Sequence, residues 1–347
     1  MTALTFAVTG LNATDNPAPG VAVIRALRDA YPQCRIVALS YDPLDSGNHM
    51  PGVADAVYLM PFPSQGTDVL KERILAIHGE QRIDVLIPTL DAELLVFIKM
   101  ETDLRAHGIR TFLPTLKGLE LRSKAKFAAL KDDLGISVPH SVTVTDAAVI
   151  AELHGQFTYP LVVKGQFYDA YIAHTPMEAE GHFHNIRAKW GLPVVVQEFI
   201  AGEEYDVVCV GDGKGALMGS VAMRKMLLTD KGKAWAGITI RDPKLHAFVV
   251  DAMAKLRWRG PCELEVMKSH SGDFYLIEVN PRFPAWVYLS VGAGRNLPQM
   301  VAQLAMDEPV SPLPPAEAGV LFVRYSYDQI CSLADFEALS TCGALQR

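Results

Sequence analysis

The sequence predicts an α/β protein whose N-terminal part is a parallel β-sheet. Short apolar runs alternate with helical patterns through the N-terminal third of the chain, and this order is typical of parallel sheets with helical crossovers. Further along, two runs of alternating apolar residues, 262–268 and 273–279, flank a turn signal and predict an antiparallel hairpin. The 347 residues are 50% hydrophobic, which allows two or three domains with a substantial core.

Charge and cysteine content narrow the classes of function. The formal net charge is -7 and no basic run occurs, so we expect no non-specific binding of nucleic acid. The five cysteines are scattered without a CxxC pair, which favours a reducing compartment over a disulfide framework or a zinc site. The start, MTALTFAVTG, lacks the basic region of a signal peptide, and no apolar run is long enough to cross a bilayer. We therefore expect a cytoplasmic protein that acts on small molecules and not on membranes.

The N-terminal elements follow from periodicity. Strands are expected at 4–9, 35–40, 56–60 and 84–88, and helices at 21–30, 67–78 and 92–104. Ligands tend to bind at the carboxyl ends of parallel strands, where this sequence has neither a dinucleotide fingerprint nor a P-loop. After the strand expected at 84–88, the sequence instead has two acidic residues, Asp91 and Glu93. Two roles stay open for these acids, contact with an acceptor substrate or capping of the next helix.

The chain is expected to leave this first domain near residues 114–117. A helix predicted at 119–134 carries Lys124, and a buried strand predicted at 159–164 ends in Lys164. A lysine after aliphatic residues is usually a strand end whose charge reaches water. Neither lysine therefore indicates a function by itself.

The stretch QEFIAGEEYDV is more informative. A strand predicted at 193–199 reaches the acid Glu198, the chain turns at Gly202, and a new strand resumes at 205–211. A break between strands exposes main-chain groups that can bond the edge of a purine. Glu204 lies where a carboxylate can accept from both hydroxyls of a ribose.

The predicted hairpin holds the residues with the clearest chemistry. With its loop centred on residues 271–272, Glu265 would face Glu278 and Glu263 would face Asn280. All four would share one face with three apolar residues, Met267, Phe274 and Leu276. A loop of odd length would shift the register by one residue and break this pairing.

Facing carboxylates on a sheet repel each other by roughly 0.2–1 kcal/mol in water, so a positive charge is expected between them. Carboxylate and amide oxygens are suitable ligands for magnesium, which also binds phosphate oxygens. Just past the strand, Arg282 adds a fork of donors that fits a phosphate or a carboxylate. The alternative is a half-buried hairpin whose acids face solvent, but the alignment of these residues favours a metal site.

In the order in which they occur, Lys124, Lys164, QEFIAGEEYDV, Glu265 and the run EVNPR at 278–282 resemble the ATP-grasp superfamily. The first domain resembles the one that precedes the grasp in carbamoyl-phosphate synthase large subunits and biotin carboxylases. The resemblance implies an ATP-grasp fold with three domains. These are an N-terminal parallel-sheet, Rossmann-like pre-ATP-grasp domain at 1–114, a small lid domain at 115–204 and a C-terminal domain with the metal hairpin at 205–347.

The resemblance also implies residue roles, with ATP and Mg²⁺ or Mn²⁺ as cofactors. The residues matched to ATP contacts are Lys124 and Lys164 at the phosphates, Glu198, Phe199 and Ile200 at the adenine, and Glu204 at the ribose. Those matched to metal ligands are Glu265, Glu278 and Asn280. Arg282 matches an arginine near the phosphoryl group or acceptor. As a departure from the family, Lys164 precedes GQFYDAY where most members have a glycine-rich loop, which leaves lid closure open.

A second candidate catalytic residue is Arg224, which lies on the strand that resumes after the break and would face the phosphates or a substrate carboxylate. The leading hypothesis is an ATP-dependent carboxylate–amine ligase that forms an amide through an acyl phosphate and releases ADP and phosphate. Its substrates would be small-molecule or peptide carboxylates and amines. A bicarbonate-activating enzyme and a non-catalytic nucleotide-binding protein stay open as alternatives, as does the oligomeric state, a homodimer included.

Overall fold

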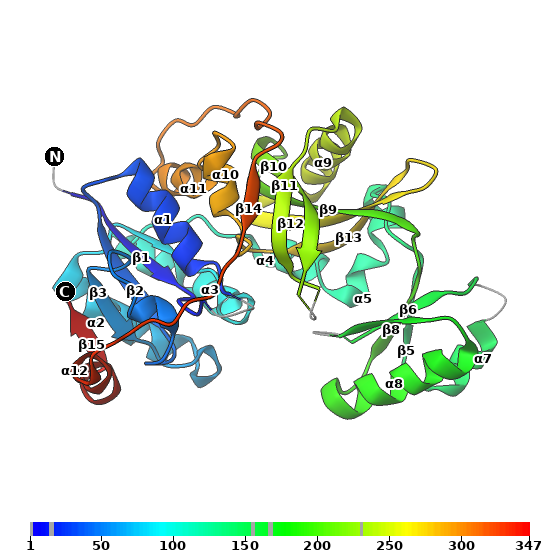
Figure 1. Ribbon diagram of the computed structural model, residues 1–347, viewed down its shortest axis with the longest axis horizontal. Coiled ribbons are helices and arrows are strands. Elements are labelled where there is room, and N and C mark those ends of the chain that lie inside the picture. Colours follow the sequence, from blue (N-terminus) through cyan, green and yellow to red (C-terminus); the bar gives the residue numbers. More distant parts are fainter. Residues whose placement is uncertain (1–2, 14–16, 154–156, 166–168, 230–231) are drawn as a thin grey trace. The chain divides into compact units, whose positions relative to one another are not determined.

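The computed structural model describes residues 3–13, 17–153, 157–165, 169–229 and 232–347 (Figure 1). The chain divides into two compact units. The first consists of Met1–Leu119, Asp206–Leu264 and Asn280–Arg347, and the second of Glu120–Tyr205 and Glu265–Val279. The expected division into three domains stays a prediction.

The first unit opens with strands and helices in alternation. These elements are β1 (Thr5–Thr9), α1 (Gly20–Ala30), β2 (Arg35–Ser40), β3 (Ala56–Leu59), α2 (Thr67–Gln81), β4 (Val85–Ile87) and α3 (Asp91–Ala106). β1 pairs in parallel with β2 and with β4, and β2 pairs in parallel with β3. The predicted parallel sheet is confirmed, and the residues that follow β1, β2 and β4 lie along one edge of it.

Burial explains why the strands of this sheet read as unbroken apolar runs. Every residue of β1 and β4 is buried, as in parallel sheets covered on both faces. Phe6 packs in a core that includes Ile24 of α1. Its neighbour Ala7 points to the other face and packs in a core that includes Ile74 of α2 and Phe97 of α3.

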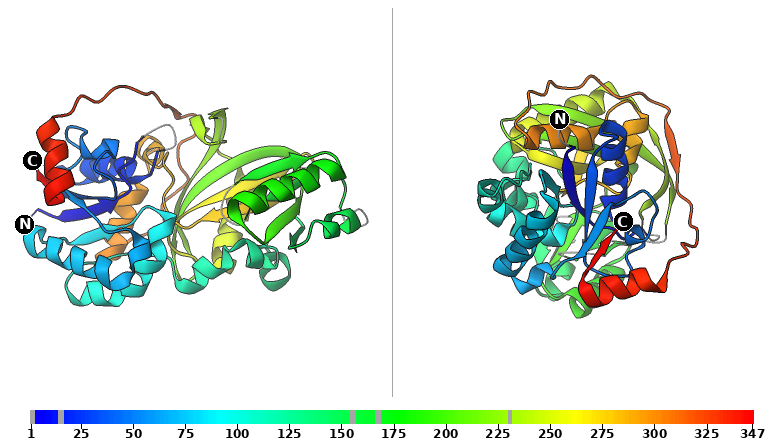
Figure 2. Two further views of the ribbon diagram at one scale, coloured as in Figure 1. Left: turned by 90° about the horizontal axis from the view of Figure 1, so that it is seen from below. Right: turned by 90° about the vertical axis from the view of Figure 1, so that its left-hand side faces the viewer.

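The C-terminal tail adds a strand that the sequence did not predict. β15 (Ala344–Gln346) pairs antiparallel with β3, so the strand order is β15-β3-β2-β1-β4. The red tail lies beside the blue strands in Figures 1 and 2. Leu339 is fully buried ahead of this strand, and the backbone N–H of Arg347 donates to the Asp55 carbonyl at 2.9 Å. The tail thus covers backbone groups that β3 would otherwise expose as an edge strand.

A second sheet follows further along the chain. The later elements of the first unit are β10 (Leu217–Leu228), β11 (Ala234–Thr239), α9 (Pro243–Leu256), α10 (Tyr288–Gly292), α11 (Leu297–Ala305), β14 (Leu321–Val323) and α12 (Leu333–Glu337). Three more strands have residues in both units, β9 (Gly202–Asp212), β12 (Arg259–Ser269) and β13 (Phe274–Asn280). The six strands of this sheet have the order β13-β12-β9-β10-β11-β14.

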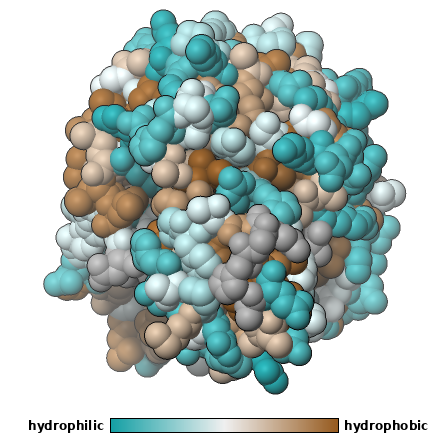
Figure 3. All heavy atoms as spheres, turned by 90° about the vertical axis from the view of Figure 1, so that its right-hand side faces the viewer, coloured by the Kyte–Doolittle hydropathy of each residue, from teal (hydrophilic) through white to brown (hydrophobic). Residues whose placement is uncertain are grey.

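The second unit is built on a four-stranded sheet. Its elements are α5 (Lys124–Phe127), α6 (Leu130–Leu134), β5 (Ser141–Val144), α7 (Ala148–Glu152), β6 (Leu161–Lys164), β7 (Ala170–Ala173), α8 (Pro176–Trp190) and β8 (Val194–Glu198). The strand order is β5-β8-β6-β7, and every pairing is antiparallel. Phe183 and Ile186 of α8 pack with Val163 and Val196 of the sheet. On the face shown in Figure 3, apolar side chains lie in small groups among polar ones.

The prediction of a single helix at 119–134 is wrong. The structure has three short helices there, α4 (Leu116–Leu121), α5 and α6. Ser123 has extended backbone angles, φ -60° and ψ 135°, directly before α5. Serine favours such a position because its side chain competes for backbone hydrogen bonds at helix starts. Among the described residues, none of the helices is both long and apolar enough for a bilayer crossing.

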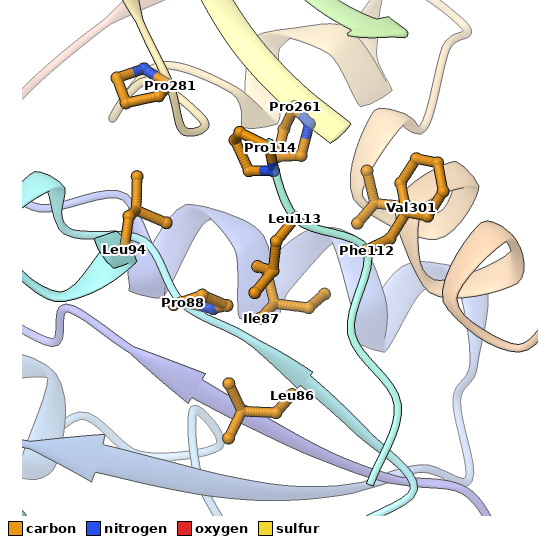
Figure 4. Close-up of a pocket in the computed structure, with 10 residues that line it drawn as sticks. All are labelled: Leu86, Ile87, Pro88, Leu94, Phe112, Leu113, Pro114, Pro261, Pro281 and Val301. Carbon is orange, nitrogen blue, oxygen red and sulfur yellow. The ribbon is translucent and has the colours of Figure 1, made fainter. Parts of the chain in front are cut away.

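A small cavity in the first unit is a packing gap. It is lined by proline and aliphatic side chains and by Phe112, the prolines being Pro88, Pro114, Pro261 and Pro281 (Figure 4). Its volume is about 10 Å³, which at most admits one water molecule. Residues 112–114 are therefore packed tightly against Pro261 and Pro281, and this cavity is not a ligand site.

The carboxylate of Glu93 ties together the ends of three parallel strands. It accepts hydrogen bonds from the Thr9 hydroxyl, from the Tyr41 hydroxyl at 2.5 Å, and from the backbone N–H groups of Thr89 and Leu90 at 2.9 Å each. Glu93 is fully buried, and burial raises the pKa of its carboxyl group. The sequence left two roles open for Glu93, contact with a substrate or capping of the next helix. The structure shows that Glu93 caps the start of α3. Contact between Glu93 and a substrate is excluded, because no part of its side chain reaches the surface.

Replacing Glu93 by Ala should lower the free energy of unfolding by about 3 kcal/mol, because four donors lose a buried acceptor. Urea denaturation measures this. Glu72→Ala, an exposed change on α2, is the matched control and should stay within about 0.5 kcal/mol of the wild type. If the two variants were equally stable, the proposed role of Glu93 in holding the ends of the three strands together would be contradicted.

Candidate functional site

The strand break predicted after Glu198 is confirmed. β8 ends at Glu198, β9 begins at Gly202, and Phe199 and Ile200 lie between them, half-exposed and outside any strand. One oxygen of Glu198 accepts from the backbone N–H of His140 at 3.2 Å. Lys164 ends β6 as expected. The backbone of this segment is thus available for hydrogen bonds outside a sheet, as an adenine edge requires.

Gly202 is required by a close approach of two backbones within the second unit. A Cβ atom at this position would lie 1.9 Å from the carbonyl oxygen of Lys268. Next to it, the N–H of His270 donates to the Ala201 carbonyl at 3.3 Å. The segment after Glu198 is therefore held directly against the turn of the acidic hairpin, formed by β12 and β13.

The turn of this hairpin has an odd number of residues, so the expected register is wrong near the loop. The N–H of Ser269 donates to the Asp273 carbonyl at 2.8 Å, and the N–H of Gly272 donates to the Ser269 carbonyl at 2.9 Å. Ser269 thus faces Asp273 across a loop of three residues. The last residue of the loop, Gly272, has a φ angle of +91°. A glycine with positive φ is typical of such loops. Continued unchanged, this register would place Ile277 opposite Glu265.

The apolar residues of the hairpin also divide differently from the prediction. The Lys268 ammonium lies 5.4 Å from the centroid of the Phe274 ring, so Phe274 shares a face with Lys268. Leu276, two residues further along β13, follows Phe274 to that face and is fully buried. Met267 alternates to the face of Glu265. The expected grouping of Phe274 and Leu276 with Glu265 is therefore wrong.

At the other end of the hairpin the predicted neighbours do meet. Asn280 Nδ2 donates to Glu263 Oε2 at 3.2 Å, whereas an unchanged register would leave these side chains on opposite faces. The alternation of buried and exposed residues in β13 breaks at Ile277 and Glu278, both half-exposed. One extra residue at this point, as in a β-bulge, accounts for both observations.

Glu263 is the centre of a buried polar cluster in the first unit. Only 6% of the residue is exposed, and its carboxylate also accepts from Trp286 Nε1 at 2.7 Å. Arg282 NH1 lies 3.4 Å from Glu263, and Arg282 Nε donates to Asp91 at 2.9 Å. The arginine fork that the sequence singled out is thus bound by two carboxylates. For Asp91 the structure thus shows an ion pair with Arg282.

Arg224 is not part of this cluster. It is exposed and pairs with Ile238 across β10 and β11. The next residue, Lys225, points to the opposite face and forms an ion pair of 3.3 Å with the buried Asp206. The sequence contained a signal for Lys225, because it follows the buried Met223 by two residues on one strand. The predicted catalytic role of Arg224 stays untested.

All residues matched to ATP contacts fall in the second unit, as do Glu265 and Glu278. Glu204 and Lys164 are half-exposed there. Lys124 begins α5, but its side chain lies outside the described residues, as do residues 166–168 of the expected lid loop. Asn280, Arg282 and Arg224 belong to the first unit.

The donor set of the hairpin fits a hard divalent cation. In the part of the chain that the structure describes, no three His, Cys, Asp or Glu side chains converge as a metal site. The expected ligand set of two carboxylates and one amide stays a prediction. Glu265 and Glu278 are half-exposed. The Nδ2 atom of Asn280 faces Glu263, which directs its oxygen the other way. Oxygen donors of this kind suit Mg²⁺ when phosphate oxygens complete its shell.

Comparison with known proteins agrees with this geometry. The family model described as "ATP-grasp in the biosynthetic pathway with Ter operon" matches residues 192–326. A phosphoribosylamine–glycine ligase of Synechocystis sp. is 28% identical over 214 residues, 55% of this chain and 51% of that protein. This chain therefore spans about half the length of the curated relative.

Solved structures match over more of the chain. The biotin carboxylase domain dimer of Hydrogenobacter thermophilus 2-oxoglutarate carboxylase, in complex with MgADP and bicarbonate, has a TM-score of 0.67 at 17% identity, covering 88% of this chain and 70% of that one. An L-amino acid ligase of Bacillus licheniformis has a TM-score of 0.63 at 17% identity, covering 88% and 75%. The fold is thus the ATP-grasp fold, as predicted. The family model adds a match in sequence over residues 192–326 of this chain.

Gly202→Ala should lower the free energy of unfolding by about 2 kcal/mol, because its Cβ atom would force two strands apart. Thermal unfolding measures the effect. Gly181→Ala is the control, since nothing lies within 4 Å of a Cβ atom there on α8. That change should stabilise by roughly 0.5–1 kcal/mol. A neutral Gly202→Ala would show that the close approach is absent in solution.

Proposed function

We propose that this protein is an ATP-dependent ligase that joins a carboxylate to an amine. The observation that supports the proposal is an acidic hairpin whose sequence carries Glu265, Glu278 and Asn280, in a chain with the ATP-grasp fold. The names of two similar proteins support it, since one is a phosphoribosylamine–glycine ligase and another an L-amino acid ligase. A structural neighbour was solved with MgADP, which supports ATP and Mg²⁺ as cofactors.

The proposed nucleotide site uses residues of the second unit. The backbone after Glu198, at Phe199 and Ile200, would bond the adenine, and Glu204 would accept from the ribose hydroxyls. Lys124 and Lys164 would contact the phosphates. Glu265, Glu278 and Asn280 would hold Mg²⁺, which supplies positive charge at the phosphate oxygens during transfer.

The proposed chemistry proceeds in two steps. A carboxylate oxygen attacks the terminal phosphorus of ATP, an O–P bond forms, and the bond to ADP breaks. The amine then attacks the acyl carbon, a C–N bond forms, and phosphate leaves as the nitrogen loses a proton. No side-chain nucleophile is required, so the protein acts by positioning and by offsetting charge.

The ion pairs of Arg282 suit a residue that positions a substrate and offsets negative charge. Held by Asp91 and by Glu263, the guanidinium of Arg282 keeps one direction without help from a ligand. A donor fixed before the reaction loses little entropy when the charge develops. Arg282 would therefore stabilise the transferring group or the acyl phosphate.

Bicarbonate activation is the second candidate, favoured by the likeness to a biotin carboxylase solved with bicarbonate. The two functions differ in what they require. A bicarbonate-activating enzyme would release ADP with bicarbonate and no amine, whereas the ligase would need both a carboxylate and an amine.

Glu278→Gln should lower the turnover number at least a hundredfold, because it removes one negative oxygen from the cation site without changing side-chain volume. The measurement is ADP release during a screen of carboxylate and amine pairs. Glu152→Gln, an exposed change in the second unit, should leave turnover unchanged. If neither the wild type nor the control forms ADP with any carboxylate and amine pair or with bicarbonate, the proposal of an active ligase is contradicted.

A further inference from the structure

Exposed apolar side chains are concentrated in the segment that leads from β14 to α12. Between residues 321 and 333, six large apolar residues are at least half exposed, namely Leu321, Val323, Tyr325, Tyr327, Ile330 and Leu333. The rings of Tyr325 and Tyr327 stack, with their centroids 5.7 Å apart. This segment follows the outside of the first unit in both views of Figure 2. A large exposed apolar surface on a folded protein usually marks a site where a partner binds.

The sheet register brings a seventh residue into this surface. Val323 pairs with Ala236, which pairs in turn with Leu227 of β10, and directly paired residues point to the same face of a sheet. Leu227 is 55% exposed. Leu321 and Tyr325 lie two residues to either side of Val323, so alternation places them on this face as well. We call the seven residues the apolar strip.

The backbone of β14 can pair with a further strand on the side away from β11. Among the described residues, β14 is the last strand in the order of the six-stranded sheet. The N–H of Arg324 donates to the Trp235 carbonyl at 2.9 Å and so continues the ladder to β11. In an antiparallel ladder, alternate residues bond to the facing strand and the residues between them point the other way. The N–H and C=O groups of Leu321 and Val323 therefore point to the outer edge of the sheet.

The sequence of this edge does not prevent pairing. Proteins usually protect an exposed strand edge with charged residues, proline or a covering segment, and β15 covers β3 of the parallel sheet in this way. Residues 319–327 contain no proline and one charged residue, Arg324. Its guanidinium carbon lies 5.6 Å from the centre of the Phe322 ring, on the face opposite to the strip.

We propose that the apolar strip is the interface of a homodimer, in which β14 pairs antiparallel with β14 of a second copy of this chain. With exposed fractions of 52–88%, the seven residues present roughly 900 Å², close to the ~800 Å² that each partner contributes to a standard interface. The net charge of -7 makes two copies repel each other. Because residues 319–327 include no acidic residue, two copies can approach along this edge with little repulsion.

A strand edge is complementary to itself, which suits the two-fold symmetry of most dimers. With Val323 on the two-fold axis, Leu321 would lie opposite Tyr325 of the second copy, so the apolar row would continue across both chains. The backbone groups that point outwards would then bond to each other in pairs. This inference does not depend on the proposed ligase activity.

Sedimentation velocity of the full chain over roughly 1–100 μM tests the dimer. At the upper concentrations the wild type should sediment with twice the 37.9 kDa mass of the chain. Val323→Glu should raise the dissociation constant of the dimer about a hundredfold or more, because it would bury two unpaired charges at the axis. Val250→Glu is the matched control, the same change at an exposed residue of α9 in the same unit, and should sediment like the wild type.

Val323→Pro separates pairing of the strand edges from packing of side chains alone. The N–H of Val323 points away from β11, so proline keeps the ladder to β11. It removes one bond to the second copy from each chain and should raise the dissociation constant about tenfold. The far-UV circular dichroism spectrum of each variant should match that of the wild type, which distinguishes dissociation from unfolding.

A wild type that stays monomeric at every concentration overturns the inference. A dimer that Val323→Glu leaves intact, or that Val250→Glu dissociates to the same extent, also overturns it. If Val323→Pro forms the dimer as readily as the wild type while Val323→Glu does not, the strip is the interface and the proposed pairing of β14 with its copy is wrong.

Discussion

The buried carboxylate of Glu263 is the constraint on which the first unit depends. Its oxygens accept from Trp286 and Asn280 and form an ion pair with Arg282, which in turn binds Asp91. These contacts connect a strand, the end of the hairpin, the loop after it and the start of α3. Removing one partner from a buried ion pair typically costs 3–5 kcal/mol, so the charge of Glu263 selects one arrangement of its neighbours.

This cluster has a consequence for chemistry. Because the amide of Asn280 donates to Glu263, the orientation of its oxygen is decided before any cation binds. Arg282 is likewise directed by two carboxylates and not by a ligand. The residues nearest the proposed reaction are therefore held by bonds within the protein, and this is the condition under which fixed charges are most effective in phosphoryl transfer.

Periodicity predicted the parallel sheet and the hairpin, since both depend on apolar runs that are local in sequence. Periodicity failed to predict features of the structure that depend on a single residue or on a partner far away in the sequence. The predicted register of the hairpin was wrong at the loop, because the loop has three residues instead of two. Its last residue, Gly272, adopts a positive φ that allows this loop length. β15 has only three residues, and its pairing with β3 depends on a segment nearly three hundred residues earlier.

The most direct test of the central claim is a crystal structure with magnesium and a non-hydrolysable ATP analogue. We predict a cation about 2.0–2.1 Å from carboxylate oxygens of Glu265 and Glu278, with the Asn280 oxygen and analogue phosphates in the same shell. A nucleotide bound elsewhere, or a cation coordinated without either glutamate, would contradict the proposal that this hairpin holds the metal of an ATP-dependent ligase.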